Sequence, residues 1–226
     1  ARTRPEFQRS APRDIALSAL NKRFRNAIVR IEFTMVMNVV ETKLNPTKSE
    51  RYYGHGSEPS HGTGFFIREN EILTNAHVVE RARYGSIRVK SPATGNVEFR
   101  VEVVGVGGSE EIDIAVLRMP EDEVMRFKKR SGLSKIPTLK FGDSDKVRQA
   151  DPVAIFGYPS ASDELKVIQA EVTGRQYLTL EFGRFMCPHQ LIEVGPGGVI
   201  QSGNSGGPAL DRHGIVVGVP AFGSGY

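Results

Sequence analysis

The chain has 226 residues, of which 39% are hydrophobic and 25% are charged. This length and composition exclude a largely disordered chain and fit a globular protein with one large core or two smaller ones. No apolar run approaches the roughly 18 residues that span a bilayer, so we expect no membrane span. The single cysteine, Cys187, excludes an intrachain disulfide and a zinc site built from several thiolates.

The formal net charge is +4, but most of the positive charge lies at the start of the chain. The first 30 residues carry eight Lys or Arg and two acidic residues, and the remainder is slightly acidic. A basic leader on a near-neutral body is more typical of a solvated tail, or of what remains of a targeting segment, than of a nucleic-acid site. We therefore expect no nucleic-acid partner, and binding through the leader stays a minor alternative.

Apolar residues at loosely helical spacing predict a short helix over Asp14 to Arg25. From Ala27 onward, a dozen short segments with β character, separated by Gly, Pro, Asn and Ser, predict strands. Sheets with that many strands curl or split, which favours closed antiparallel barrels or a sandwich. Between these segments, the run from Glu41 to His61 is predicted to be a long irregular segment.

One charged segment, Pro120 to Pro137, lacks strand alternation and is interpreted as the crossing between two all-β halves. The predicted organisation is therefore a basic leader with a short helix, a first β half, a crossing and a second β half. These parts cover residues 1–26, 27–119, 120–136 and 137–226.

Residues 202–208 read SGNSGGP, and glycines at this density predict a loop whose backbone is closely approached. The hydroxyl of Ser205 needs a base and a third group that orients the base before it can act as a nucleophile. His77 follows a predicted strand in LTNAHVV. Asp113 begins an apolar strand in EIDIAVL, where a carboxylate requires a donor such as an imidazole N–H. We therefore predict that His77, Asp113 and Ser205 form a catalytic triad.

The glycines beside Ser205 also suit an oxyanion hole. Backbone N–H groups stabilise the negative charge that a carbonyl oxygen gains during acyl transfer. The predicted oxyanion loop is Gly203, Asn204 and Ser205, with the amides of Gly203 and Ser205 as its natural donors.

The segments ILTNAHVV, DIAVLRM, LKFGDSDKVRQADPVAIFGYP and SGNSGGPAL resemble the Deg/HtrA family of chymotrypsin-fold serine proteases, over roughly residues 27–220. FGDSD is typical of Deg proteases, and residues 177–190 are most similar to the plant-type members. The resemblance implies an all-β fold of two antiparallel six-stranded β-barrels with the active site between them. His77 and Asp113 would come from the first barrel and Ser205 from the second.

The resemblance further implies a homotrimer, or a multiple of one, that cleaves unfolded or damaged proteins without a cofactor. PDZ domains usually follow the protease in this family, so we expect this chain to be the protease part of a longer protein. The basic leader is compatible with a processed organellar protein of a mitochondrion or chloroplast, and another quality-control compartment is the alternative. Because loops of this fold can collapse reversibly, a protein-binding scaffold or holding chaperone with a resting site is the alternative.

The specificity pocket is where the sequence departs from the family, because GPGGVI at residues 195–200 replaces a usual DAAI. By position, Ile200 and Phe222 are expected to line the pocket, which predicts a preference for small to medium aliphatic P1 residues. Four further histidines lack the spacing of metal ligands, so no metal site is expected: His55, His61, His189 and His213. Cys187 is expected to be an inert or mildly reactive thiol.

Overall fold

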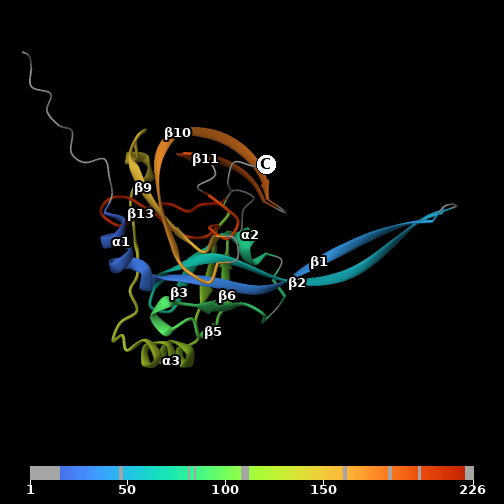
Figure 1. Ribbon diagram of the computed structural model, residues 1–226, viewed down its shortest axis with the longest axis horizontal. Helices are drawn as coiled ribbons and strands as arrows, with labels where there is room; N and C mark the ends of the chain where they lie inside the picture. The colour runs from blue at the N-terminus through green and yellow to red at the C-terminus, as the bar shows by residue number, and fades with distance from the viewer. Residues whose placement is uncertain are drawn as a thin grey trace, which may run out of the picture.

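Two curled β-sheets are the main secondary structure of the described residues. The computed structural model describes residues 16–45, 48–80, 82–83, 85–107, 112–159, 162–182, 185–197 and 200–221. The first sheet has the strand order β5-β4-β1-β2-β3-β7-β6, and the second has the order β11-β10-β9-β12-β13-β8. Figure 1 shows the two sheets with the helices around them.

The first sheet contains β1 (Ile28–Asn45), β2 (Lys48–Arg68), β3 (Glu71–Thr74), β4 (Arg88–Lys90), β5 (Glu98–Arg100), β6 (Glu102–Val106) and β7 (Ala115–Arg118). The second contains β8 (Lys140–Phe141), β9 (Pro152–Gly157), β10 (Lys166–Phe182), β11 (Phe185–Gly195), β12 (Ala209–Leu210) and β13 (Ile215–Gly218). The helices are α1 (Leu17–Phe24), α2 (Ala76–Val79) and α3 (Glu121–Ser131), with short 3-10 turns η1 (Arg25–Ala27), η2 (Pro92–Thr94) and η3 (Ser144–Lys146).

The mostly β architecture and the short N-terminal helix confirm the sequence-based expectation, but the strand count differs from two sheets of six. The first sheet has seven strands, because β5 and β6 pair at opposite edges of the sheet and only Val101 separates them in the chain. The sheet must therefore curl until its two edges meet at Val101. In the second sheet, β8 and β13 pair in parallel, so the expectation of wholly antiparallel pairing is wrong there.

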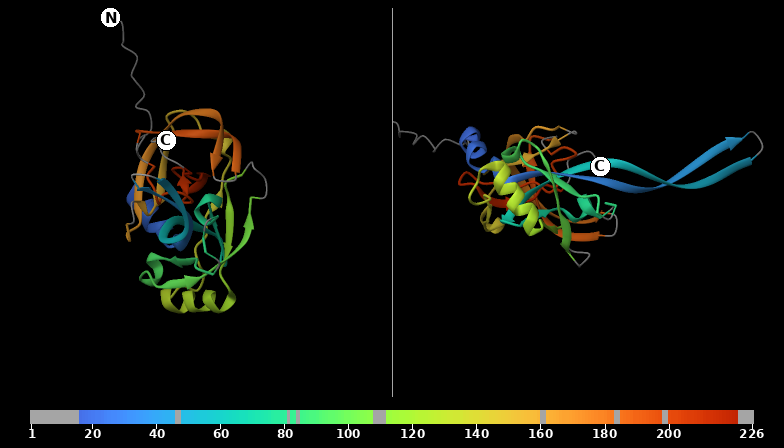
Figure 2. Two further views of the ribbon diagram at one scale, coloured as in Figure 1. Left: turned by 90° about the vertical axis from the view of Figure 1, so that its right-hand side faces the viewer. Right: turned by 90° about the horizontal axis from the view of Figure 1, so that it is seen from below.

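The hairpin of β1 and β2 is far longer than the sequence predicted. Its register runs from Ile28 opposite Phe65 to Asn45 opposite Lys48, and Figures 1 and 2 show it extending well away from the rest of the protein. The segment from Glu41 to His61 was expected to be irregular, and that expectation is wrong. The two strands pair through backbone groups, which does not require the alternation of apolar side chains that marks a half-buried strand.

The crossing between the sheets contains a helix, α3. Its first turn is acidic, its last turn is basic, and Gly132 ends it with a left-handed φ of 70°. The helix dipole favours acidic residues in the first turn and basic residues in the last. A glycine with a left-handed φ is a usual end of a helix. The helix buries Phe127 against Phe66 and Phe99, with ring centroids 5.6 and 5.0 Å apart, so it packs on the first sheet.

A shared hydrophobic core joins the two sheets. One cluster combines Leu20 of α1 with Phe65 of the first sheet and Phe156 of the second. Phe24 of α1 also packs against Gly214, at the turn between β12 and β13. The N-terminal helix therefore packs on the second sheet although its chain continues into the first. None of the described helices is long and apolar enough to cross a membrane.

Candidate active site

His77 and Asp113 meet at one edge of the first sheet because β3 and β7 are antiparallel neighbours. Thr74, the last residue of β3, lies opposite Ala115, the first residue of β7. The chain leaves β3 through Asn75 and enters α2, of which His77 is the second residue. Asp113 lies just before β7, so the pairing brings residues 36 positions apart into contact.

The carboxylate of Asp113 is buried and holds His77 through two hydrogen bonds. Its Oδ2 lies 2.7 Å from Nδ1 of the His77 ring, and its Oδ1 accepts from the His77 backbone N–H at 2.9 Å. Asn75 fixes the position from the other side, because its Nδ2 donates to the carbonyl of Asp113 at 2.8 Å. An ionised carboxylate only accepts, so Nδ1 is the donor, and Nε2 is the ring nitrogen with a lone pair for a proton.

The loop that carries Ser205 begins with a tight turn. The amide of Asn204 donates to the carbonyl of Gln201 at 3.0 Å, and Gly203 has a φ of 95°. A positive φ at the third residue is the requirement of a type II turn, which glycine meets without strain. A Cβ on Gly203 would also lie 2.2 Å from the carbonyl oxygen of Tyr158. The sequence therefore has glycine at a position where both the backbone angle and the packing demand it.

Gly206 ties the same loop to the His77 side of the protein. Its φ is 83°, and a Cβ there would lie 2.1 Å from Oγ1 of Thr74 and 3.0 Å from the amide nitrogen of Asn75. Thr74 and Asn75 are the residues that lead directly into α2. The structure thus brings the loop of Ser205 against the strand end that positions His77.

Thr63 of β2 joins the loop to the first sheet, and sequence reasoning missed this residue. Its Oγ1 donates to the carbonyl of Gly203 at 2.6 Å, and its backbone N–H donates to the carbonyl of Ser205 at 2.9 Å. The same Oγ1 accepts from the amide of Tyr158 at 3.0 Å, so the fully buried side chain has both partners it needs. A small hydroxyl residue between Gly62 and Gly64 is the sequence signal that could have found it.

These contacts orient the peptide groups of the predicted oxyanion loop. The carbonyls of Gly203 and Ser205 point to Thr63, and the amide of Asn204 is taken by Gln201. Neither the amide of Gly203 nor that of Ser205 donates to a backbone carbonyl among the described residues. The amide of Asn204 is therefore not a donor for an oxyanion in this arrangement, and the amides of Gly203 and Ser205 stay the predicted donors.

The hydroxyl of Ser205 makes a contact that the sequence did not reveal. Its Oγ donates to the carbonyl oxygen of Ala221 at 3.1 Å, three residues beyond the end of β13. A hydroxyl has one proton, so the proton given to Ala221 is not at the same time given to an imidazole.

The predicted specificity pocket is described only on one side. Ile200 is partly buried and packs against the second-sheet cluster that contains Val147, Val153 and Ala209. Phe222 lies outside the described residues, as do the side chains of His55, Cys187 and His189. Within the described ranges, no group of three or more His, Cys, Asp and Glu side chains could hold a metal ion.

Comparison with known proteins shows which family the chain matches. Residues 62–219 match the family described as "Trypsin-like peptidase domain". The mitochondrial Protease Do-like 4 of Arabidopsis thaliana is 27% identical over 175 residues, which are 77% of this chain and 30% of that protein. Serine protease HTRA2 of Bos taurus, also mitochondrial, is 32% identical over 162 residues, which are 71% of this chain and 31% of that protein.

Solved structures show the same fold at low sequence identity. The HtrA-type protease AlgW with a decapeptide has a TM-score of 0.63 and 20% identity, covering 92% of this chain and 59% of its own. The active form of the Rv3671c protease from M. tuberculosis has a TM-score of 0.64 and 23% identity, covering 97% of this chain and 82% of its own.

The chain spans about a third of the length of the curated relatives it matches. The family match nevertheless covers more than half of this chain and contains His77, Asp113 and Ser205. The chain therefore belongs to the trypsin-like peptidase family, as a homologue of the Deg/HtrA proteases, including the plant Do-like proteases.

Proposed function

We propose that this chain is the protease domain of a serine endopeptidase, with Ser205 as nucleophile, His77 as general base and acid, and Asp113 as the group that orients the imidazole. The observation that carries the proposal is the arrangement at the edge of β3. There Asp113 holds His77 through two hydrogen bonds, and Gly206 packs against the residues that precede His77. Three elements far apart in the chain thus converge on one place.

In this mechanism Ser205 Oγ attacks the carbonyl carbon of the scissile peptide while its proton passes to Nε2 of His77. The negative charge on the substrate oxygen is bound by the amides of Gly203 and Ser205. The imidazolium then gives its proton to the leaving amine, the C–N bond breaks, and an acyl-enzyme remains on Ser205. Water attacks this ester with His77 again taking the proton, and His77 returns that proton to Ser205 Oγ as the ester C–O bond breaks and the acid product leaves.

The contact between Ser205 and Ala221 has to change before this chemistry begins. The hydroxyl donates to the carbonyl of Ala221, so turnover requires its proton to turn toward His77 instead. Movement of the segment around Ala221 would release the hydroxyl, and a bound substrate that displaces this segment is a simple cause. A resting arrangement of this kind is also what the scaffold or chaperone alternative requires.

The substrate, assembly and compartment follow from the relatives and form part of the proposal. We propose unfolded or damaged proteins as substrates, small to medium aliphatic P1 residues beside Ile200, and a homotrimer or its multiple as the assembly. The names of Do-like relatives place them in mitochondria and chloroplasts, which supports an organellar compartment. We further propose that each curled sheet closes as a β-barrel, for which the adjacent edges of the first sheet at Val101 are the support.

Covalent labelling tests the protease assignment against the scaffold alternative. A fluorophosphonate probe labels a serine only when its hydroxyl is activated and its oxyanion hole is formed. We expect labelling of the wild-type protein and hydrolysis of unfolded casein, with both lost in Ser205→Ala. Casein hydrolysis that persists in a clean preparation of Ser205→Ala contradicts the assignment, and absence of labelling in every oligomeric state supports the scaffold.

A further inference from the structure

Gly203, the residue with the first oxyanion amide, is in contact with a histidine that the triad does not use. A Cβ on Gly203 would lie 2.6 Å from Nε2 of His61 and 2.2 Å from the carbonyl oxygen of Tyr158. Gly203 therefore packs against both the imidazole ring and that carbonyl on the side where a Cβ would lie. His61 itself hydrogen-bonds to the backbone of Tyr158, which fixes the ring beside the glycine.

His61 and Thr63 act on Gly203 from the same face of β2. Residues two apart on a strand point to the same side, and both lie on the β1–β2 hairpin, where His61 is opposite Glu32 and Thr63 is opposite Arg30. Thr63 bonds the carbonyl of Gly203, and His61 packs on its Cα. Thr63 thus holds the peptide group that follows Gly203, and His61 limits where the Cα of Gly203 can lie, so a shift of the His61 ring would change where the Gly203 amide points.

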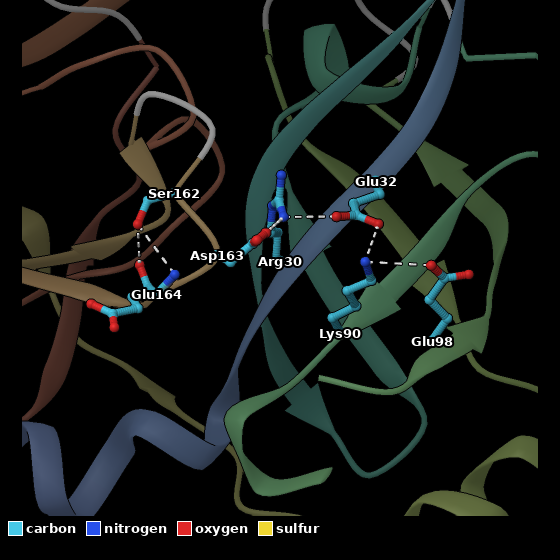
Figure 3. A network of polar contacts seen from close by, with 7 residues as sticks. All are labelled: Arg30, Glu32, Lys90, Glu98, Ser162, Asp163 and Glu164. Carbon is cyan, nitrogen blue, oxygen red and sulfur yellow. Dashed lines mark hydrogen bonds and ion pairs between the residues drawn. The ribbon is translucent and has the colours of Figure 1, made fainter. Parts of the chain in front are cut away.

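The charged groups around His61 come from both halves of the protein. Figure 3 shows Arg30 between Glu32 and Asp163, and Lys90 between Glu32 and Glu98. Arg30 and Glu32 belong to β1, while Asp163 lies between β9 and β10. The segment 201–207 that carries Ser205 has no charged residue of its own. The phenol of Tyr158 is neutral, since burial raises its pKa well above the usual range.

These surroundings favour an uncharged ring. Burial lowers the pKa of His61 below its ordinary value, and the Arg30 guanidinium lowers it further. The hydrogen bond to Tyr158 and the carboxylates of Glu32 and Asp163 act in the opposite direction without reversing the shift. A depressed pKa for a base means that the folded arrangement is stabilised above the ordinary histidine value of about 6.5 and loses that stabilisation as the pH falls.

We propose that His61 is a positioning residue for the oxyanion loop, and that its protonation at acidic pH releases Gly203 from the geometry that binds the oxyanion. Protonation turns the second ring nitrogen into a donor and adds a positive charge beside Arg30. Both changes oppose the packing of the ring against Gly203. This inference rests on the proposed protease function for its kinetic consequences, while the contact between His61 and Gly203 does not depend on it.

The kinetic test compares wild type, His61→Gln, His61→Ala and the control His213→Gln. His213 is an exposed histidine on the turn between β12 and β13, so its variant carries the same substitution away from Gly203. At pH 7.5, His61→Gln should stay within about threefold of wild-type kcat, because its amide can donate to the Tyr158 carbonyl. His61→Ala should lose about 10- to 100-fold in kcat, part of the value of one oxyanion donor, with KM changed less than threefold.

The pH profile separates positioning from a purely structural role. In wild type and His213→Gln, log kcat/KM should fall at acidic pH with a slope steeper than 1, since protonation of His61 adds its loss to that caused by protonation of the proposed general base. In His61→Gln the slope should fall to 1. An unchanged slope of the acid limb in His61→Gln would overturn the proposal, as would a loss in His61→Ala that appears in KM alone.

Nuclear magnetic resonance gives a readout that needs no activity. In Ser205→Ala, which cannot digest itself, the amide shift of Gly203 should titrate together with the His61 ring. The double variant Ser205→Ala/His61→Gln should lose that titration. If Gly203 titrates identically in the double variant, the proposal is wrong. If the coupling is present but wild type never hydrolyses a substrate, His61 does position the loop, and it is the protease assignment that fails.

Discussion

The two sides of the candidate site are held in different ways. His77 and Asp113 are fixed within one sheet, by the pairing of β3 with β7 and by two hydrogen bonds between neighbouring segments. Ser205 is held across the two halves, through Thr63, Thr74 and a glycine-rich turn with positive φ values. The contact between His77 and Asp113, the proposed acid–base pair, therefore forms within one sheet, whereas the loop that carries Ser205 depends on how the two halves meet. We therefore expect any regulation of activity to act on the loop that carries Ser205 rather than on the contact between His77 and Asp113.

The largest effect should come from breaking the pair within the first sheet. Asp113→Asn replaces a carboxylate by an amide that can donate to Nδ1, which favours the tautomer with the proton on Nε2. We expect kcat to fall by about 10⁴-fold with the fold intact. Steady-state kinetics on a peptide substrate, with circular dichroism as the control, measures this. A loss below tenfold would show that Asp113 does not orient the base.

Thr63→Val should break the contact between the halves while keeping the shape of the side chain. It removes the donor to the Gly203 carbonyl and the acceptor for the Tyr158 amide. We expect kcat to fall by about 10²- to 10³-fold, as for the loss of an oxyanion donor, and the free energy of unfolding to fall by about 1–3 kcal/mol. Thr63→Ser keeps the hydroxyl and is the control, and equal losses in the two variants would contradict this role.

Gly206→Ala tests whether the nucleophile loop really is packed against the strand end before His77. The added Cβ would meet Oγ1 of Thr74 at 2.1 Å at a φ of 83°, so we expect a loss of about 2–3 kcal/mol. Gly132→Ala is the matched control, because Gly132 has a φ of 70° but nothing within 4 Å of its Cβ position. The control should cost about 1 kcal/mol. Urea unfolding of both variants gives the comparison, and equal costs would argue against the packing.

The smallest effect is expected at the ion pair between Arg30 and Asp163, which also links the halves. The side chain of Asp163 is 81% exposed, so water and salt screen the interaction. Asp163→Asn should change the free energy of unfolding by less than about 1 kcal/mol. A loss above 2 kcal/mol in urea unfolding would show that this pair, rather than the shared hydrophobic core, holds the halves together.

Particular residues show how far the sequence could be interpreted. The β character, the N-terminal helix and the glycine-rich loop were predicted, because each has a local signal in composition or spacing. Helix α3 was missed although its acidic first turn, basic last turn and Gly132 are helix signals, since the segment was interpreted only by its lack of strand alternation. The length of the β1–β2 hairpin was missed because its strands pair through backbone hydrogen bonds, which leave no pattern of apolar side chains in the sequence. The catalytic triad stays a prediction. The structure gives the contact between His77 and Asp113 and the packing of the Ser205 loop against the strand end before His77.

The sequence by itself determined which residue types were present for the proposed acyl transfer and where glycine was needed, because backbone angles and side-chain chemistry are local properties. Only the tertiary structure decided that Thr63 and His61 act on Gly203, that Ser205 donates to Ala221, and that α1 packs on the second sheet. These contacts join residues far apart in the chain, so the sequence around each residue does not indicate which partner it contacts. The sequence thus specified the proposed reacting groups, and the packing of the two halves determined how they are held.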